Sequence, residues 1–62
     1  MQKVNVYKLK HSVLDNSNTY SFYKELEINE DNIETLDKLD TIDGITYYRC
    51  VMTSGKSYII RK

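Results

Sequence analysis

The stretch from Thr19 to Ile28, TYSFYKELEI, alternates between apolar and polar side chains and sets the expectation for the rest of the fold. Its apolar row comprises Tyr20, Phe22, Leu26 and Ile28 and is interrupted only by Lys24. A period of two is typical of a strand with one buried and one exposed face. We therefore predict a β-strand here, with Tyr23 and the neighbouring glutamates on its exposed face.

The segment before this strand predicts its hairpin partner. Residues 4–9 carry spaced apolar side chains among polar ones, as an extended segment does. The run Asp15-Asn16-Ser17-Asn18 consists of side chains that favour turns. The sequence therefore predicts a strand, a hairpin loop and the Thr19–Ile28 strand.

After Ile28 the spacing of apolar residues changes to one near 3.6. Ile33, Leu36 and Leu39 would share one face of a helix. Asp31 and Glu34 have the spacing of a capping box, which is a helix-start signal. We therefore predict a short helix over about residues 30 to 40.

The C-terminal third predicts a second hairpin. Asp43-Gly44 supplies a turn, Ile45–Thr53 is rich in β-forming residues, and Thr53–Lys56 provides a tight reversal into Ser57–Arg61. The expected fold is α+β, a β-β-α-β-β arrangement with an antiparallel sheet and one short helix. The chain, residues 1–62, is expected to form a single domain.

The strand expected at Ile45–Thr53 is apolar on both faces. Tyr47 and Val51 fall on one side, while Tyr48, Cys50 and Met52 fall on the other. One helix can cover only one of these faces, so a second subunit is the simplest cover for the other. We therefore expect a homodimer or an obligate complex.

Length and composition argue against catalysis. A 62-residue chain has a small core, and a catalytic site needs a rigid surrounding shell, so we expect no enzyme and no cofactor. The single cysteine, Cys50, cannot form an internal disulfide, which suits a reducing compartment such as the cytoplasm, or the host cytoplasm if the chain is phage-encoded. No apolar run reaches the length of a membrane span, and Met1–Val6 lacks the core of a signal peptide.

Two chemical motifs are incomplete. Gly55-Lys56-Ser57 resembles the end of a phosphate-binding loop, but Cys50 stands where that loop needs its first glycine, so we predict a hairpin turn. His11 is the only histidine and Cys50 the only thiol, so no zinc site of ordinary type can be built. We expect no metal ligands.

Charge is segregated along the chain although the net charge is zero. All nine acids lie between Asp15 and Asp43, and both ends are basic. Opposite segments could lie side by side and neutralise one another. Alternatively, the acids form a docking surface. The partner-binding residues then expected are Tyr23, Glu25, Glu27, Glu30, Glu34 and Asp37.

Basic residues offer a second interpretation, a nucleic-acid surface. It would use Lys8, Lys10, Arg49, Lys56 and Arg61, with Tyr48 or Tyr58 as a stacking platform. This requires the two basic ends of the chain to share one face.

The first half of the chain resembles the small inhibitor of uracil-DNA glycosylase made by phi29-like phages. The resemblance rests on residues 4–36: a first strand, the polar turn Asp15–Asn18, the aromatic strand and an acidic helix from Asp31 to Leu36. That family is a dimeric DNA mimic whose helix grips the enzyme with aromatic side chains. Ile33 and Asp37 stand at the matching positions and depart from that pattern.

A second resemblance covers Ile28–Asp37 and Ser54–Ile60. This part is similar to the FlbD/SwrD family of small flagellar proteins and, more loosely, to the second half of LytTR DNA-binding domains. Both would make residues 30–40 a strand. A strictly alternating strand would place Ile33 and Leu36 on opposite faces, so we retain the helix.

These observations favour a non-enzymatic protein-binding module. It would use an acidic strand-helix surface to bind a host protein, as a phage-encoded inhibitor of a DNA-acting enzyme such as uracil-DNA glycosylase does. The alternative is a small nucleic-acid-binding or FlbD/LytTR-like regulatory protein that uses its basic terminal strands.

Overall fold

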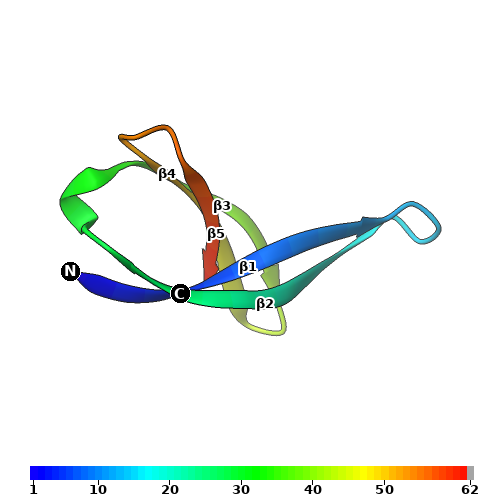
Figure 1. The fold of residues 1–62 in the computed structure, drawn as a ribbon. Coiled ribbons are helices and arrows are strands. Elements are labelled where there is room, and N and C mark those ends of the chain that lie inside the picture. The colour runs from blue at the N-terminus through cyan, green and yellow to red at the C-terminus, as the bar shows by residue number, and fades with distance from the viewer. Residues whose placement is uncertain (62) are drawn as a thin grey trace.

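The computed structural model describes residues 1–61 and shows an all-β fold. Five strands form one antiparallel sheet in the order β2-β1-β5-β4-β3 (Figure 1). The strands are β1 (Gln2–Ser12), β2 (Ser17–Ile28), β3 (Ile33–Ile42), β4 (Ile45–Met52) and β5 (Ser57–Arg61). The one helical element of the described residues is a single 3-10 turn, η1 (Glu30–Asn32).

The predicted helix over residues 30–40 is wrong, and with it the α+β assignment. A helix start does form locally, but its N-cap is Asn29 and not the Asp31–Glu34 pair: the Asn29 side chain accepts a hydrogen bond from the Asp31 N–H at 3.0 Å. Ile33 then turns extended, with φ −81° and ψ 119°, and the helical turn ends. A helix of about ten residues is marginal without tertiary support. Here the tertiary support comes from pairing with β4, which stabilises residues 33–42 as a strand and not as a helix.

Two β-bulges in β3 explain why its apolar residues do not recur at every second position, as they do in a regular strand. Pairing moves from Ile33 opposite Met52 to Thr35 opposite Val51, so one extra residue, Glu34, is inserted. Leu36 then lies opposite Cys50, on the same face as Ile33. A second shift between Lys38 and Asp40 displaces the row again. The residues that share a face are therefore not spaced by two, and their spacing imitates a helix.

The predicted turns at Asp43-Gly44 and Thr53–Lys56 are confirmed, whereas the first hairpin loop comprises residues 13–16, with Ser17 and Asn18 of the predicted turn already paired in β2. Asp43 (φ 53°) and Gly44 (φ 78°) form a two-residue connection between β3 and β4, with the positive φ values that such hairpin turns require. Gly55 (φ 90°) reverses the chain between β4 and β5, where its N–H donates to the Met52 carbonyl at 2.9 Å. The Gly-Lys-Ser motif is thus a hairpin turn, as predicted.

The β1–β2 hairpin crosses the β3-β4-β5 sheet, and the two parts meet over a short contact (Figure 1). Within the described residues, β1 pairs with β5 only at Val6, opposite Ile60, and at Tyr7, opposite Ile59. Consecutive side chains of a strand point to opposite faces. Val6 and Tyr7 are both buried, so each enters a different core on either side of the crossing.

The first core is aliphatic and the second aromatic. The first core comprises Val4, Val6, Ile28, Cys50, Met52 and Ile60. In the second core, the Tyr47 ring stacks on Tyr20, with centroids 4.1 Å apart and planes 9° apart. Tyr7 meets the Tyr47 ring edge-on at 5.3 Å and the Phe22 ring at 6.0 Å.

Both faces of β4 are therefore covered within one chain. The Cys50 side packs in the first core, and Tyr47 packs in the second. The two-faced pattern of β4 does not by itself require a second subunit. The homodimer stays a prediction.

Within residues 1–61 no helix has the length and apolar content needed to cross a bilayer.

Candidate functional site

Antiparallel pairing places basic segments beside acidic ones. Lys3 of β1 lies opposite Glu27 of β2, and its Nζ is 4.0 Å from an Oε of Glu25. Asp37 of β3 lies opposite Arg49 of β4. Acidic and basic residues that are separated along the sequence therefore lie beside one another on neighbouring strands. The acids do not form one uninterrupted row.

A groove opens beside the first core, between the N-terminal halves of β1 and β3. Its volume is about 450 Å³. Its apolar lining comprises Val4, Ile28, Ile33, Leu36 and Ile60. Its charged lining comprises Lys3, Glu25, Glu30 and Arg61. The groove is therefore an incompletely filled extension of the core with a charged rim.

One wall of this groove is an open strand edge. Gln2–Asn5 of β1 line the groove and pair with β2 on their other side. Among the described residues, β5 pairs with β1 only at Val6 and Tyr7, so this four-residue segment has no strand on its second edge. Backbone N–H and C=O groups that point into the groove there are available to a further strand.

The predicted acidic contact residues separate in the structure. Glu25 and Glu30 both line the groove. Glu27 lines a second, smaller depression of about 280 Å³, together with Met1, Met52 and Tyr58. Glu34 and Asp37 are exposed on β3 and line neither hollow.

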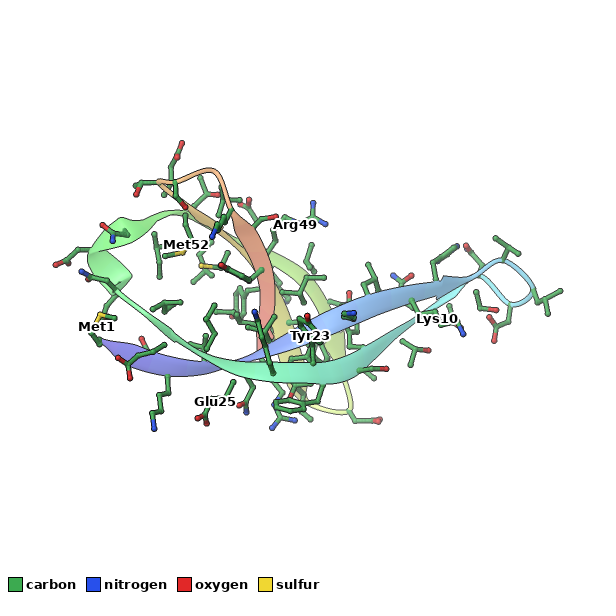
Figure 2. The ribbon with its side chains drawn as sticks, in the orientation of Figure 1. Met1, Lys10, Tyr23, Glu25, Arg49 and Met52 are labelled. Atoms are coloured by element: carbon green, nitrogen blue, oxygen red, sulfur yellow. The ribbon has the colours of Figure 1, made fainter. Side chains whose placement is uncertain are left out.

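Tyr23 lies apart from the acids with which it was grouped. The Lys8 Nζ lies 4.2 Å from the centroid of the Tyr23 ring, and the Lys24 Nζ lies 5.4 Å from the same centroid. Figure 2 shows Tyr23 near the crossing, Lys10 further along the hairpin and Glu25 toward the opposite end. The local sequence does not indicate this grouping, because the bulge that brings Tyr23 and Lys24 together is set by the pairing of β2 with β1.

The predicted single basic face is not formed. Lys8 and Lys10 lie on the hairpin, Arg49 faces Asp37, and Lys56 is in the β4–β5 turn. The Arg61 guanidinium lies 5.5 Å from the Tyr7 ring. Tyr48 and Tyr58, the expected stacking platforms, pack against the first core.

Two groups with shifted pKa values belong to the cores. Burial, together with the nearby Asp40 charge, raises the pKa of Tyr20, whose hydroxyl donates to Asp40 Oδ2 at 3.2 Å. Burial raises the pKa of the Cys50 thiol, which is fully covered in the first core. Both shifts favour the neutral group in the folded state, so these side chains serve packing.

These shifts predict a loss of stability at alkaline pH. Both folded-state pKa values are raised, so their stabilising contribution is complete below the unfolded-state values of 9.0 for Cys50 and 10.0 for Tyr20 and is lost as pH rises. Urea denaturation between neutral pH and pH 11 should show the free energy of unfolding falling from about pH 9. Cys50→Ala should move the onset toward pH 10. An identical onset in both proteins would contradict this account.

No group of three His, Cys, Asp or Glu side chains in the part of the chain that the structure describes is placed to hold a metal ion. Comparison with known proteins gives no match to a family model, a curated protein or a solved structure. Both resemblances therefore stay predictions. The segment Asp31–Leu36 is not the helix that the inhibitor resemblance implies, whereas a strand at Ile33–Ile42 is what the second resemblance implies.

Proposed function

We propose that this chain is a non-enzymatic protein-binding module that takes an extended segment of a partner protein into the groove beside β1. The open edge of Gln2–Asn5 carries this proposal, because it offers main-chain hydrogen bonds in line with β5. Strand addition of this kind takes its affinity from the backbone and its specificity from alternate side chains.

The groove lining defines the side chains that such a segment needs. An inward-pointing residue would meet Ile33, Leu36 and Ile60, so an aliphatic or aromatic side chain fits there. The rim carboxylates of Glu25 and Glu30 favour a basic residue beside it. Both carboxylates are in long, exposed ion pairs, with Lys3 and with the Met1 amino group, each at 4.0 Å. Such pairs contribute about 0 to 1 kcal/mol and exchange easily for a partner's charge.

A host protein with a basic, DNA-binding surface satisfies this charge preference, so an inhibitor of a DNA-acting enzyme remains within the proposal. DNA mimicry would need an uninterrupted acidic row, and Lys3 and Arg49 interrupt it. A cytoplasmic location is also proposed, because the chain has a single buried free thiol, Cys50.

The apolar lining of the groove is tested by measuring how much partner protein the immobilised chain captures from nuclease-treated lysate. Two matched variants are compared with the wild type. Leu36→Asp puts a carboxylate into the groove, whereas Leu9→Asp makes the same change on β1 outside it. The two leucines are similarly exposed, at 38% and 41%. We expect Leu36→Asp to lower capture at least about tenfold, the equivalent of 1.4 kcal/mol, and Leu9→Asp to leave it intact. Equal capture by both variants would refute a groove site.

The rim is tested by two double charge reversals. Glu25→Lys with Glu30→Lys changes the groove, and Glu34→Lys with Asp37→Lys makes the same net change on β3 outside it. Only the first pair should weaken capture and reduce its salt dependence. A loss confined to the second pair would transfer the interaction to the exposed face of β3.

A further inference from the structure

The part of the β1–β2 hairpin beyond the crossing, residues 8–24, forms a projecting arm. It accounts for the elongated shape of the molecule, 38 × 19 × 18 Å, and ends in the loop at the far right of Figure 1. Residues 8–24 contain three lysines and one acid, Asp15, which lies in the loop at the tip. The strands of the arm therefore carry a net positive charge. Asp40 of β3 accepts hydrogen bonds from Asn18 and Tyr20, on the face of the arm opposite Lys8 and Lys10.

One face of this arm combines lysines with an exposed aromatic ring. Tyr7 packs into the second core, so Lys8 and Lys10 point to the opposite face of β1. On β2, the bulge places one extra residue, Tyr23, between Lys24 (opposite Val6) and Phe22 (opposite Tyr7). This bulge brings Tyr23 and Lys24 close together, with the Lys8 Nζ 4.2 Å from the Tyr23 ring centroid. We define the Lys8, Lys10, Tyr23 and Lys24 side chains as the arm face.

We propose that the arm face binds single-stranded nucleic acid, with the three lysines on successive phosphates and the Tyr23 ring stacked on a base. Lys8 and Lys10 are two residues apart on a strand, a separation of about 7 Å, which matches the spacing of phosphates in an extended strand. Lysine over an exposed ring gains only about 0.5 to 1 kcal/mol, so the ammonium groups can move to phosphates and leave the ring to a base.

The position of the cluster favours nucleic acid over an anionic membrane. Val13 and Leu14 are exposed at the tip, but the tip loop also carries Asp15. Hydrogen bonds from Ser17 lower the pKa of Asp15 and keep it charged. The lysines and Tyr23 lie instead on the strands β1 and β2, away from the tip loop. An unpaired base is required because stacking on Tyr23 needs a free base face.

This site is independent of the groove. The groove lining contains no residue from 8 to 24, so a variant of the arm face leaves the groove residues unchanged. Failure of nucleic-acid binding would leave the protein-binding proposal standing, and the reverse also holds.

The test is fluorescence anisotropy of a short labelled oligothymidine titrated with the protein at several salt concentrations. Three lysine–phosphate contacts predict a slope of about −2 in the plot of log affinity against log salt. Tyr23→Ala should weaken binding about 5- to 150-fold, and Lys8→Glu with Lys24→Glu should abolish it at physiological salt.

Matched controls separate the arm face from charge and aromaticity in general. Phe22 is 60% exposed and Tyr23 is 52% exposed, and these neighbours point to opposite faces of β2, so Phe22→Ala should bind nearly as the wild type does. Lys38→Glu with Lys56→Glu makes the same net charge change away from the arm. Absence of binding at low salt would overturn the proposal, as would equal losses in the control variants. Tighter binding to duplex DNA or to phosphatidylserine vesicles than to the oligonucleotide would overturn it as well.

Discussion

Replacing Tyr47 with alanine is expected to remove at least about a third of the free energy of unfolding at 25 °C. Tyr47 is buried at the centre of the second core, stacked on Tyr20 at 4.1 Å and edge-on to Tyr7 at 5.3 Å. Removing a buried aromatic side chain of this size costs about 3 to 5 kcal/mol. A chain of 62 residues has a total stability of only about 3 to 9 kcal/mol. The change therefore removes between about a third and all of the free energy of unfolding.

Urea denaturation followed by far-ultraviolet circular dichroism measures this loss. Tyr47→Phe is the matched control because it keeps the ring and both aromatic contacts, and it should cost less than about 1 kcal/mol. A cost below about 1 kcal/mol for Tyr47→Ala would mean that the second core does not hold the hairpin against the sheet.

Elements with regular alternation or specific turn residues could be predicted from the sequence. Thr19–Ile28 is a strand as expected, but its apolar row does not lie on one face. Tyr20 and Phe22 contact the second core, and beyond the bulge at Tyr23 the row continues with Leu26 and Ile28 in the first core, on the other face. Asp43-Gly44 and Gly55 adopt the positive φ values that mark turns, so the hairpin connections followed from residue type alone.

β3 could not be predicted in the same way, because its pairing contains two irregularities. The bulge at Glu34 brings Ile33 and Leu36 to one face, and Leu39 falls at the second shift. Together these residues have a helical spacing, and Asn29 supplies a true cap for the single turn of η1. Only the partner strand, β4, decides between the two conformations. A bulge depends on that partner and leaves no reliable signal in the local sequence.

The candidate sites depend even more on tertiary structure. Charge segregation along the chain suggested an acidic surface, but antiparallel strands pair the basic segments with the acidic ones. Within residues 1–61 the groove lies where β1 diverges from β5 beyond the pairs Val6–Ile60 and Tyr7–Ile59, a divergence that no local pattern encodes. Tyr23 was correctly expected to be exposed, yet a bulge gives it lysine neighbours rather than glutamates.

The crossing makes the two cores depend on one short contact. Val6 enters the first core and Tyr7 the second, and among the described residues they are the two of β1 that pair with β5. Since neither core lies on a separate chain segment, loss of one removes the support of the other. We therefore expect the domain to unfold as one cooperative unit.

Ile60→Ala tests this cooperativity from the side of the first core. Ile60 is buried, lies opposite both Val6 and Tyr48, and also lines the groove. We expect Ile60→Ala to lower the free energy of unfolding by about 2 to 4 kcal/mol. This is in the lower part of the usual range because the groove already leaves part of the Ile60 side chain without packing neighbours. Ile60→Val, which keeps the branched shape, should cost about 0.5 to 1.5 kcal/mol. Far-ultraviolet circular dichroism follows the sheet. The near-ultraviolet tyrosine signal, recorded in a Tyr48→Phe, Tyr58→Phe background to remove the tyrosines of the first core, follows the stacked rings of the second core. Because Ile60 contributes to the first core and the rings lie across the sheet, both signals should shift to the same lower urea concentration. A tyrosine transition that stays at the wild-type midpoint while the sheet signal moves would show two independently stable halves.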